Sequence, residues 1–154
     1  ISGLESSKEL NENKYLFKKL EKVRKIAAIK MGMGNVSGKV LPKVALLSRS
    51  KNKNSIISRY FTPYSCHETH AVTGTCCVAS CCLIPGTIGY ELFNKTMKTP
   101  IIRIEHPMGT IDCVLKLQIK FNENLKSKKN LIYSCGIYRT SRILMKGNVY
   151  FSKE

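Results

Sequence analysis

The chain has 154 residues, with 26 Lys or Arg against 10 Asp or Glu, and therefore a formal net charge of +16. This length predicts one domain with a hydrophobic core, and a hydrophobic content of 43% excludes a disordered basic tail. No apolar run approaches the roughly 20 residues that a membrane helix needs, so we expect no membrane association through such a helix. The basic charge favours an acidic partner without naming one.

The first residues are polar, and we expect residues 1–13 to form a flexible head. The sequence starts without Met and without a secretion signal, which indicates a fragment of a longer protein. An amphipathic helix is predicted over residues 14–33, since apolar residues recur at steps of three and four: Leu16, Leu20, Val23, Ala27 and Met31. Gly32 and Gly34 would end this helix.

Two strands and a short helix of small residues are predicted next. Residues 42–48 and 56–62 have the apolar content of strands. The helix would run from about Gly74 to Ile84, with Thr73 as its N-cap, before Pro85-Gly86 stops it. The unpaired N–H groups of its first turn, expected at Gly74, Thr75 and Cys76, predict a place to hold an anion.

The seven cysteines do not have the spacing of a secreted disulfide framework, because four of them form the adjacent pairs Cys76-Cys77 and Cys81-Cys82. Zinc is an alternative, since Cys77 and Cys81 share a helix face and three more possible ligands lie upstream: Cys66, His67 and His70. A second ligand pair across a turn is missing, however. We therefore expect reduced thiols in a cytoplasmic protein, no bound metal, and Cys77 as a helix-packing residue.

The C-terminal part is predicted to be mostly strands. Residues 101–105 and 110–120 would form a hairpin, because His106-Pro107-Met108-Gly109 between them has turn chemistry. Residues 131–139 and 147–151 are two further strand candidates. Strands combined with few helices predict an α+β fold.

Several blocks in the same order resemble the PrpF-type isomerases, which act on aconitate-like and itaconate-like acids. The blocks are Leu20-Glu-x-Val-Arg, Pro42-Lys43-Val44-Ala45, His67 with Thr73-Gly74 and Ile84-Pro85-Gly86-Thr87, His106-Pro107-x-Gly109, and Arg139-Thr140-x-Arg142. Ordered blocks over about residues 16–151 are far more specific than one motif.

The resemblance implies a fold similar to diaminopimelate epimerase, in which two similar domains each wrap a β-sheet around a central short helix. The uncharged segment from Gly74 to Ile84 agrees with such an enclosed helix. Residues 14–136 would then be the second, C-terminal domain. Residues 137–154 would pack on the first domain, which is missing from this chain, or the chain would form a homo-oligomer.

The implied chemistry is proton transfer without a cofactor, next to a carboxylate of a di- or tricarboxylic acid. In the family, the acid and base lie around a lysine and a Cys-Gly-Asn motif in the N-terminal half. This chain has no Cys-Gly-Asn, so no catalytic residue is assigned and we expect inactivity without the other half. The expected substrate-binding residues are His67, Thr73, Gly74, Thr75, Met108 and Gly109, with Met108 at the position of a family serine.

A basic nucleic-acid-binding module is the alternative function, and the charge of +16 is its motivation. Lysines are scattered along the sequence, and no stretch interleaves aromatic with basic residues as single-strand binders do. We therefore expect a small carboxylate rather than nucleic acid as the partner.

Overall fold

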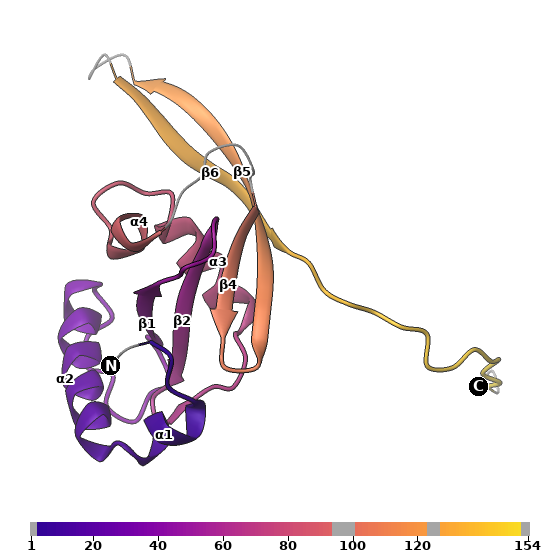
Figure 1. The fold of residues 1–154 in the computed structure, drawn as a ribbon, viewed down its shortest axis with the longest axis horizontal. Coiled ribbons are helices and arrows are strands. Elements are labelled where there is room, and N and C mark those ends of the chain that lie inside the picture. The colour runs from indigo at the N-terminus through magenta and orange to yellow at the C-terminus, as the bar shows by residue number, and fades with distance from the viewer. Residues whose placement is uncertain (1–2, 94–100, 123–126, 152–154) are drawn as a thin grey trace.

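The structure is a computed structural model of the chain. It describes residues 3–93, 101–122 and 127–151. The elements in order are α1 (Ser7–Glu12), α2 (Lys14–Lys30), β1 (Val44–Arg49), β2 (Ser55–Thr62), β3 (Ser65–Cys66), α3 (Val72–Cys81), α4 (Ile88–Leu92), β4 (Ile101–His106), β5 (Gly109–Asn122) and β6 (Ser127–Ile137). The fold is mixed α+β, as predicted (Figure 1).

The strands form one six-stranded mixed sheet with the order β1-β2-β4-β5-β6, and β3 pairs with β2 off this path. β2 and β4 are parallel, while the neighbouring pairs β1-β2, β4-β5 and β5-β6 are antiparallel. The segment that connects the parallel strands contains α3 and α4. This crossover places the short helix α3 against the sheet, where it contacts β4, β5 and β6.

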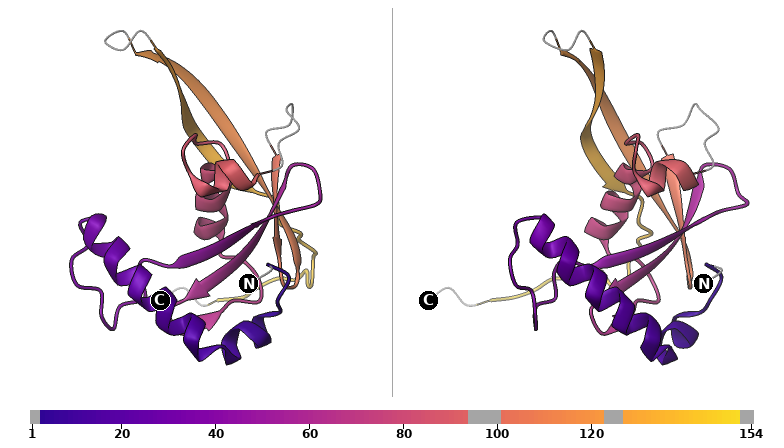
Figure 2. Two further views of the ribbon diagram at one scale, coloured as in Figure 1. Left: turned by 60° about the vertical axis from the view of Figure 1, so that its left-hand side comes forward. Right: turned by 90° about the vertical axis from the view of Figure 1, so that its left-hand side faces the viewer.

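Helices cover both faces of β1 and β2 (Figure 2). Ala45 and Leu47 of β1 pack with the core that contains α3, whereas Val44 and Leu46 pack with a second core that contains α1 and α2. Successive side chains of a strand point to opposite faces, so both sets are covered. Burial on two faces explains the nearly continuous apolar run of this strand.

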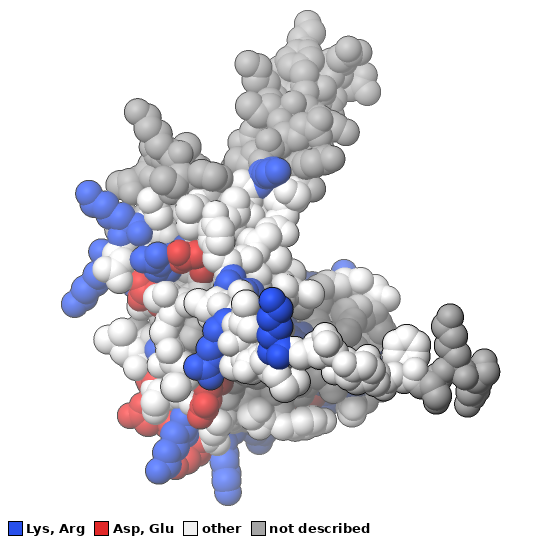
Figure 3. Space-filling model, turned by 90° about the vertical axis from the view of Figure 1, so that its right-hand side faces the viewer, with Lys and Arg blue, Asp and Glu red and all other residues white. Residues whose placement is uncertain are grey.

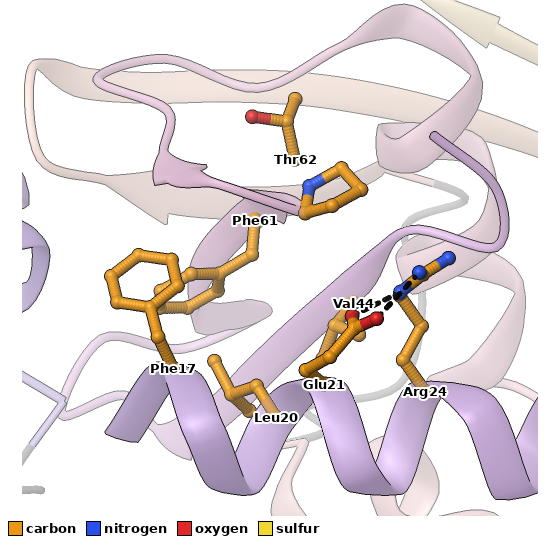
Figure 4. A pocket seen from close by; sticks show the side chains of 8 residues that line it. Phe17, Leu20, Glu21, Arg24, Val44, Phe61 and Thr62 are labelled. Atoms are coloured by element: carbon orange, nitrogen blue, oxygen red, sulfur yellow. Dashed lines mark hydrogen bonds and ion pairs between the residues drawn. The ribbon is translucent and has the colours of Figure 1, made fainter. Parts of the chain in front are cut away.

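Helix α2 lies against the sheet through apolar side chains at its N-terminal end (Figure 4). The ring centroids of Phe17 and Phe61 are 5.7 Å apart in an edge-to-face arrangement. Further along, Arg24 donates to both carboxylate oxygens of Glu21 and also to the carbonyl oxygens of Leu41 and Val36. This buried guanidinium therefore ties the helix to the loop that leads into β1.

The β4-β5 hairpin is confirmed, with His106 paired to Gly109 across a two-residue turn. Glycine suits this turn because the φ angle of Gly109 is 137°. The expected strand over residues 147–151 was wrong, since the described residues after Ile137 form neither helix nor strand. The Tyr138 N–H still donates to the Asp112 carbonyl oxygen of β5 at 3.0 Å, and the described residues beyond it run as an extended segment away from the sheet (Figure 1).

The structure also differs from the expected flexible head, because α1 forms there. Its N-cap is Ser6, whose hydroxyl accepts from the Glu9 N–H while the Glu9 carboxylate accepts from the Ser6 N–H. This capping box satisfies two N–H groups at the helix start. Leu10 is 2% exposed and belongs to the second core, so the head is anchored by burial as well.

Basic side chains are dispersed on the face that Figure 3 shows, where Lys and Arg stand among uncharged surface and some Asp and Glu. On α2, Lys25 and the buried Arg24 both pair with Glu21. The described part of this face therefore shows no continuous basic groove of the kind that follows a nucleic-acid backbone. None of the described helices is long and apolar enough to cross a membrane.

Candidate functional site

A cavity of about 350 Å³ lies beside the start of α3. Its wall combines the loop before β1, the two strands β1 and β2, and the first two turns of α3. The residues that matter for its chemistry are Lys43, Tyr60, Thr73, Gly74 and Cys77. Three segments that are distant in sequence therefore meet at one helix end.

Gly74 is required by the close approach of α3 to β2. A Cβ atom on this residue would lie 2.5 Å from Cε2 of Tyr60. The Tyr60 ring cannot easily retreat, because its side chain is 5% exposed and its centroid is 4.6 Å from the centroid of the His70 ring. Burial also raises the pKa of the Tyr60 hydroxyl, which keeps the phenol neutral beside the cavity.

Lys43 places a positive charge at this cavity. Its Nζ atom is 5.7 Å from the centroid of the Tyr60 ring, within the range of a cation–π contact. The register that pairs Ala45 with Tyr60 puts the start of β1 opposite this part of β2. A cation, a neutral phenol and a helix start thus line one wall.

Helix α3 starts two residues before the predicted position. Its N-cap is Ala71 and not Thr73, and no side chain caps it. The Thr75 N–H already donates to the Ala71 carbonyl oxygen at 2.8 Å. The N–H groups without an acceptor in the preceding turn are therefore those of Val72, Thr73 and Gly74, rather than those of Gly74, Thr75 and Cys76.

A buried hydrogen-bond network explains this earlier start. His70 Nε2 lies 3.0 Å from Ser58 Oγ, and His70 Nδ1 lies 3.1 Å from Thr75 Oγ1. Nδ1 is also 3.3 Å from the Ala71 carbonyl oxygen, which can only accept. The network therefore assigns the proton of the neutral ring to Nδ1 and makes Nε2 the acceptor for Ser58.

The imidazole of His70 is 4% exposed. Burial lowers its pKa to about 4, so the ring is neutral at pH 7. The side chain of Thr75 is fully buried, and its hydroxyl donates to the Ala71 carbonyl oxygen. His70 and Thr75 thus position the start of α3, and neither side chain lines the cavity.

The other expected substrate-binding residues lie near the helix start but outside the cavity wall. His67 is exposed, and its Nδ1 accepts from the Thr69 N–H. The Met108 N–H donates to the Glu68 carbonyl oxygen at 3.2 Å, which brings the hairpin turn with Gly109 to the segment before α3. The Met108 side chain is 69% exposed.

The cysteines are free, and all seven lie among the described residues. Cys77 is exposed and lines the cavity, so its interpretation as a helix-packing residue was wrong. The metal ligands considered from sequence do not come together. The possible metal-ligand cluster among the described residues is a different one, formed by Cys76, Cys113 and Cys135.

Lys43 and Tyr60 were missed as candidate site residues. Neither has a local signature, because their proximity to α3 depends on strand register and on the crossover. The family pattern contains both the Pro42-Lys43 block and the Thr73-Gly74 block. Their occurrence in one pattern could have suggested that Lys43 lies near the start of α3.

Comparisons with known proteins agree on one family. The PrpF protein family matches residues 1–152. The chain is 33% identical over 149 to 153 residues to several relatives, including the (4E)-oxalomesaconate Delta-isomerase of Novosphingobium sp. (strain KA1), with 97% of this chain and 40% of that protein covered. It is 29% identical to the 4-oxalomesaconate tautomerase of Pseudomonas putida, with 100% of this chain and 40% of that protein covered.

A solved structure shows the same relation. The crystal structure of methylitaconate-delta-isomerase superimposes with a TM-score of 0.70 at 25% sequence identity, covering 90% of this chain and 40% of that chain. The chain thus spans about 40% of the length of the curated relatives that it matches. Matching sequence over nearly its whole length and a matching fold lead to one assignment: the chain belongs to the PrpF family.

Proposed function

We propose that this chain supplies the substrate-binding part of an isomerase or tautomerase that acts on di- or tricarboxylic acids. The observation that carries the proposal is the uncapped start of α3, which opens into a cavity that Lys43 also lines. Relatives named as oxalomesaconate isomerase, oxalomesaconate tautomerase and 3-methylitaconate isomerase support the substrate class.

The helix start would bind one carboxylate of the substrate. The N–H groups of Val72, Thr73 and Gly74 carry the positive end of the helix dipole, and no acidic side chain lies in this first turn. Gly74 removes the side chain that would otherwise occupy the space by Tyr60. Lys43 would add a charge-assisted contact to the same or a second carboxylate.

The reaction would be a proton transfer without a cofactor. Removing a proton next to a carboxylate creates enolate-like charge, which N–H donors and a cation stabilise. The chain has no Cys-Gly-Asn motif. We therefore place the acid and base in the part of the relatives that this chain does not match, and we expect isomerisation only when that part is present.

The domain organisation follows from the same proposal. Residues 14–136 would form the second domain of a diaminopimelate-epimerase-like fold, with α3 as its central helix inside the sheet. His67, Met108 and Gly109 would lie on the side of the site that faces the first domain, since they surround the helix start without lining the cavity.

Residues 137–154 would pack on that first domain or on a second copy of the chain. Apolar side chains in this segment are 81–90% exposed: Ile143, Leu144, Met145, Val149, Tyr150 and Phe151. Contiguous exposed apolar residues of this kind mark a surface that is covered in the assembled protein.

A titration of the isotope-labelled chain with aconitate, followed by amide NMR, tests the proposed function. The amide signals of Val72, Thr73 and Gly74 should shift at millimolar ligand. Lys43→Gln should weaken binding by about threefold, the scale of an exposed ion pair, while the exposed control Lys39→Gln should not change it. Absence of shifts at the α3 start would refute the proposal.

A further inference from the structure

Three cysteines from three different elements meet on the face of the sheet that α3 covers. Cys76 comes from α3, Cys113 from β5 and Cys135 from β6, and their sulfur atoms all lie within 4.8 Å of one another. The Sγ atoms of Cys113 and Cys135 are 3.1 Å apart. In the antiparallel register Leu115 pairs with Cys135, so Cys113 and Cys135 are diagonal neighbours on one sheet face.

The surroundings of this three-cysteine cluster are apolar. Cys113 is fully buried, Cys76 and Cys135 are half-buried, and all three adjoin the main hydrophobic core with residues such as Ala79 and Leu115. No His, Asp or Glu among the described residues joins the cluster. The set therefore offers sulfur donors alone.

Burial keeps these thiols protonated when no ion is present. It raises the pKa of Cys76 to about 11, and it raises the pKa values of Cys113 and Cys135 as well. Protonated thiols are poor nucleophiles, so the cluster is not suited to covalent catalysis. A bound metal ion favours the thiolate form, because it displaces the thiol protons, which are released to water.

We propose that Cys76, Cys113 and Cys135 together bind one Cu(I) ion, which is a soft monovalent ion of low coordination number. Thiolates select soft ions, and a three-sulfur site satisfies an ion that does not need the fourth ligand of structural zinc. A metal–sulfur bond of about 2.3 Å places the sulfurs of a trigonal site about 4 Å apart. Small side-chain rotations would bring the three sulfur atoms from their present distances to this value. Binding would change the oxidation state of neither sulfur nor copper.

The site is independent of the proposed carboxylate site. Cys77, which lines the cavity, belongs to the same helix but not to the cluster. Cys66 is buried in the second core with α1 and α2. These two residues provide matched controls for any effect of removing a thiol.

The experiment is an anaerobic titration of the reduced 154-residue chain with Cu(I), in competition with a chromophoric Cu(I) chelator. We expect one tightly bound equivalent. Cys76→Ala, Cys113→Ala and Cys135→Ala should each weaken binding by more than about tenfold, since even loss of an outer-shell partner costs that much. Cys77→Ala and Cys66→Ala should bind like the unchanged chain.

Circular dichroism of each variant checks folding, and Cys76→Ala carries the test if a substitution in the buried strand position unfolds the chain. X-ray absorption of the copper-loaded chain should show three sulfur ligands. Equal Cu(I) affinity in the unchanged chain and in Cys76→Ala would overturn the proposal. So would tighter binding of Zn²⁺ through the same thiols, or a Cys113–Cys135 disulfide in a chain that takes up no Cu(I) after reduction.

Discussion

Acidification from pH 7 to pH 4 should destabilise the chain through His70. The imidazole is 4% exposed and is enclosed by Ser58, Tyr60 and Thr75. Burial lowers its pKa from 6.5 to about 4. At about 1.4 kcal/mol per pH unit, this difference corresponds to about 3 kcal/mol in the free energy of unfolding.

The direction follows from proton binding. The unfolded chain protonates His70 near pH 6.5, whereas the folded chain does so near pH 4. Between these values the unfolded state binds more protons, so the contribution is complete above pH 6.5 and is lost as pH falls to 4. Burial also lowers the pKa of His106, which acts in the same direction. The lowered pKa values of Glu21 and Asp112 add a loss at lower pH.

A variant isolates the share of His70. Glutamine keeps one donor and one acceptor for Ser58 and Thr75 but does not titrate. Between pH 7 and pH 4, the free energy of unfolding of His70→Gln should therefore fall by about 3 kcal/mol less than that of the unchanged chain. Urea unfolding at several pH values measures this difference, and His67→Gln is the exposed control. The reasoning is refuted if the pH dependences of the unchanged chain and His70→Gln coincide, or if the His70 ring titrates near pH 6.5 by NMR.

Two further predictions concern α3 and the C-terminal segment. Gly74→Ala should destabilise the chain by about 1 kcal/mol, because overpacking against Tyr60 costs about 1–3 kcal/mol and the better helix propensity of Ala returns about 1 kcal/mol. Gly136→Ala, whose Cβ meets nothing within 4 Å, should be neutral in the same urea assay, and equal stability of both variants would contradict the argument. Removing the residues after Ile137 should abolish concentration-dependent self-association in sedimentation; a monomer with and without them would exclude a second copy as their partner.

The strands were the part of the fold that local sequence determines most directly. Apolar runs and alternation predicted β1, β2, β4 and the described part of β5 close to their observed bounds. The turn at His106 to Gly109 was also predictable, because its chemistry leaves few alternatives to a hairpin. These features depend on neighbours within a few residues.

The starts of the helices depend on longer contacts. Thr73 has the better N-cap side chain, yet α3 starts at Val72 because Ser58 and Thr75 fix His70 beside Ala71. The capping box of α1 could have been predicted from the spacing of Ser6 and Glu9. Because the segment is mostly polar, however, the burial of Leu10 was not expected. The three-cysteine cluster depends on the β5-β6 register and on the crossover. Neither can be predicted from the spacing of the cysteines in the sequence.

A comparison of the helix starts among the described residues supports the proposal that the carboxylate binds at α3. Ser6, Asn13 and Thr87 cap α1, α2 and α4 through side-chain oxygen atoms, and Glu9 and Glu91 add acidic groups to the first turns of α1 and α4. These groups satisfy the N–H donors and offset the helix dipole. At α3, Ala71 does neither. An uncapped start costs about 1 kcal/mol of stability, and a bound carboxylate would supply the missing acceptor. A side-chain cap at this position would compete with the substrate for the same N–H groups.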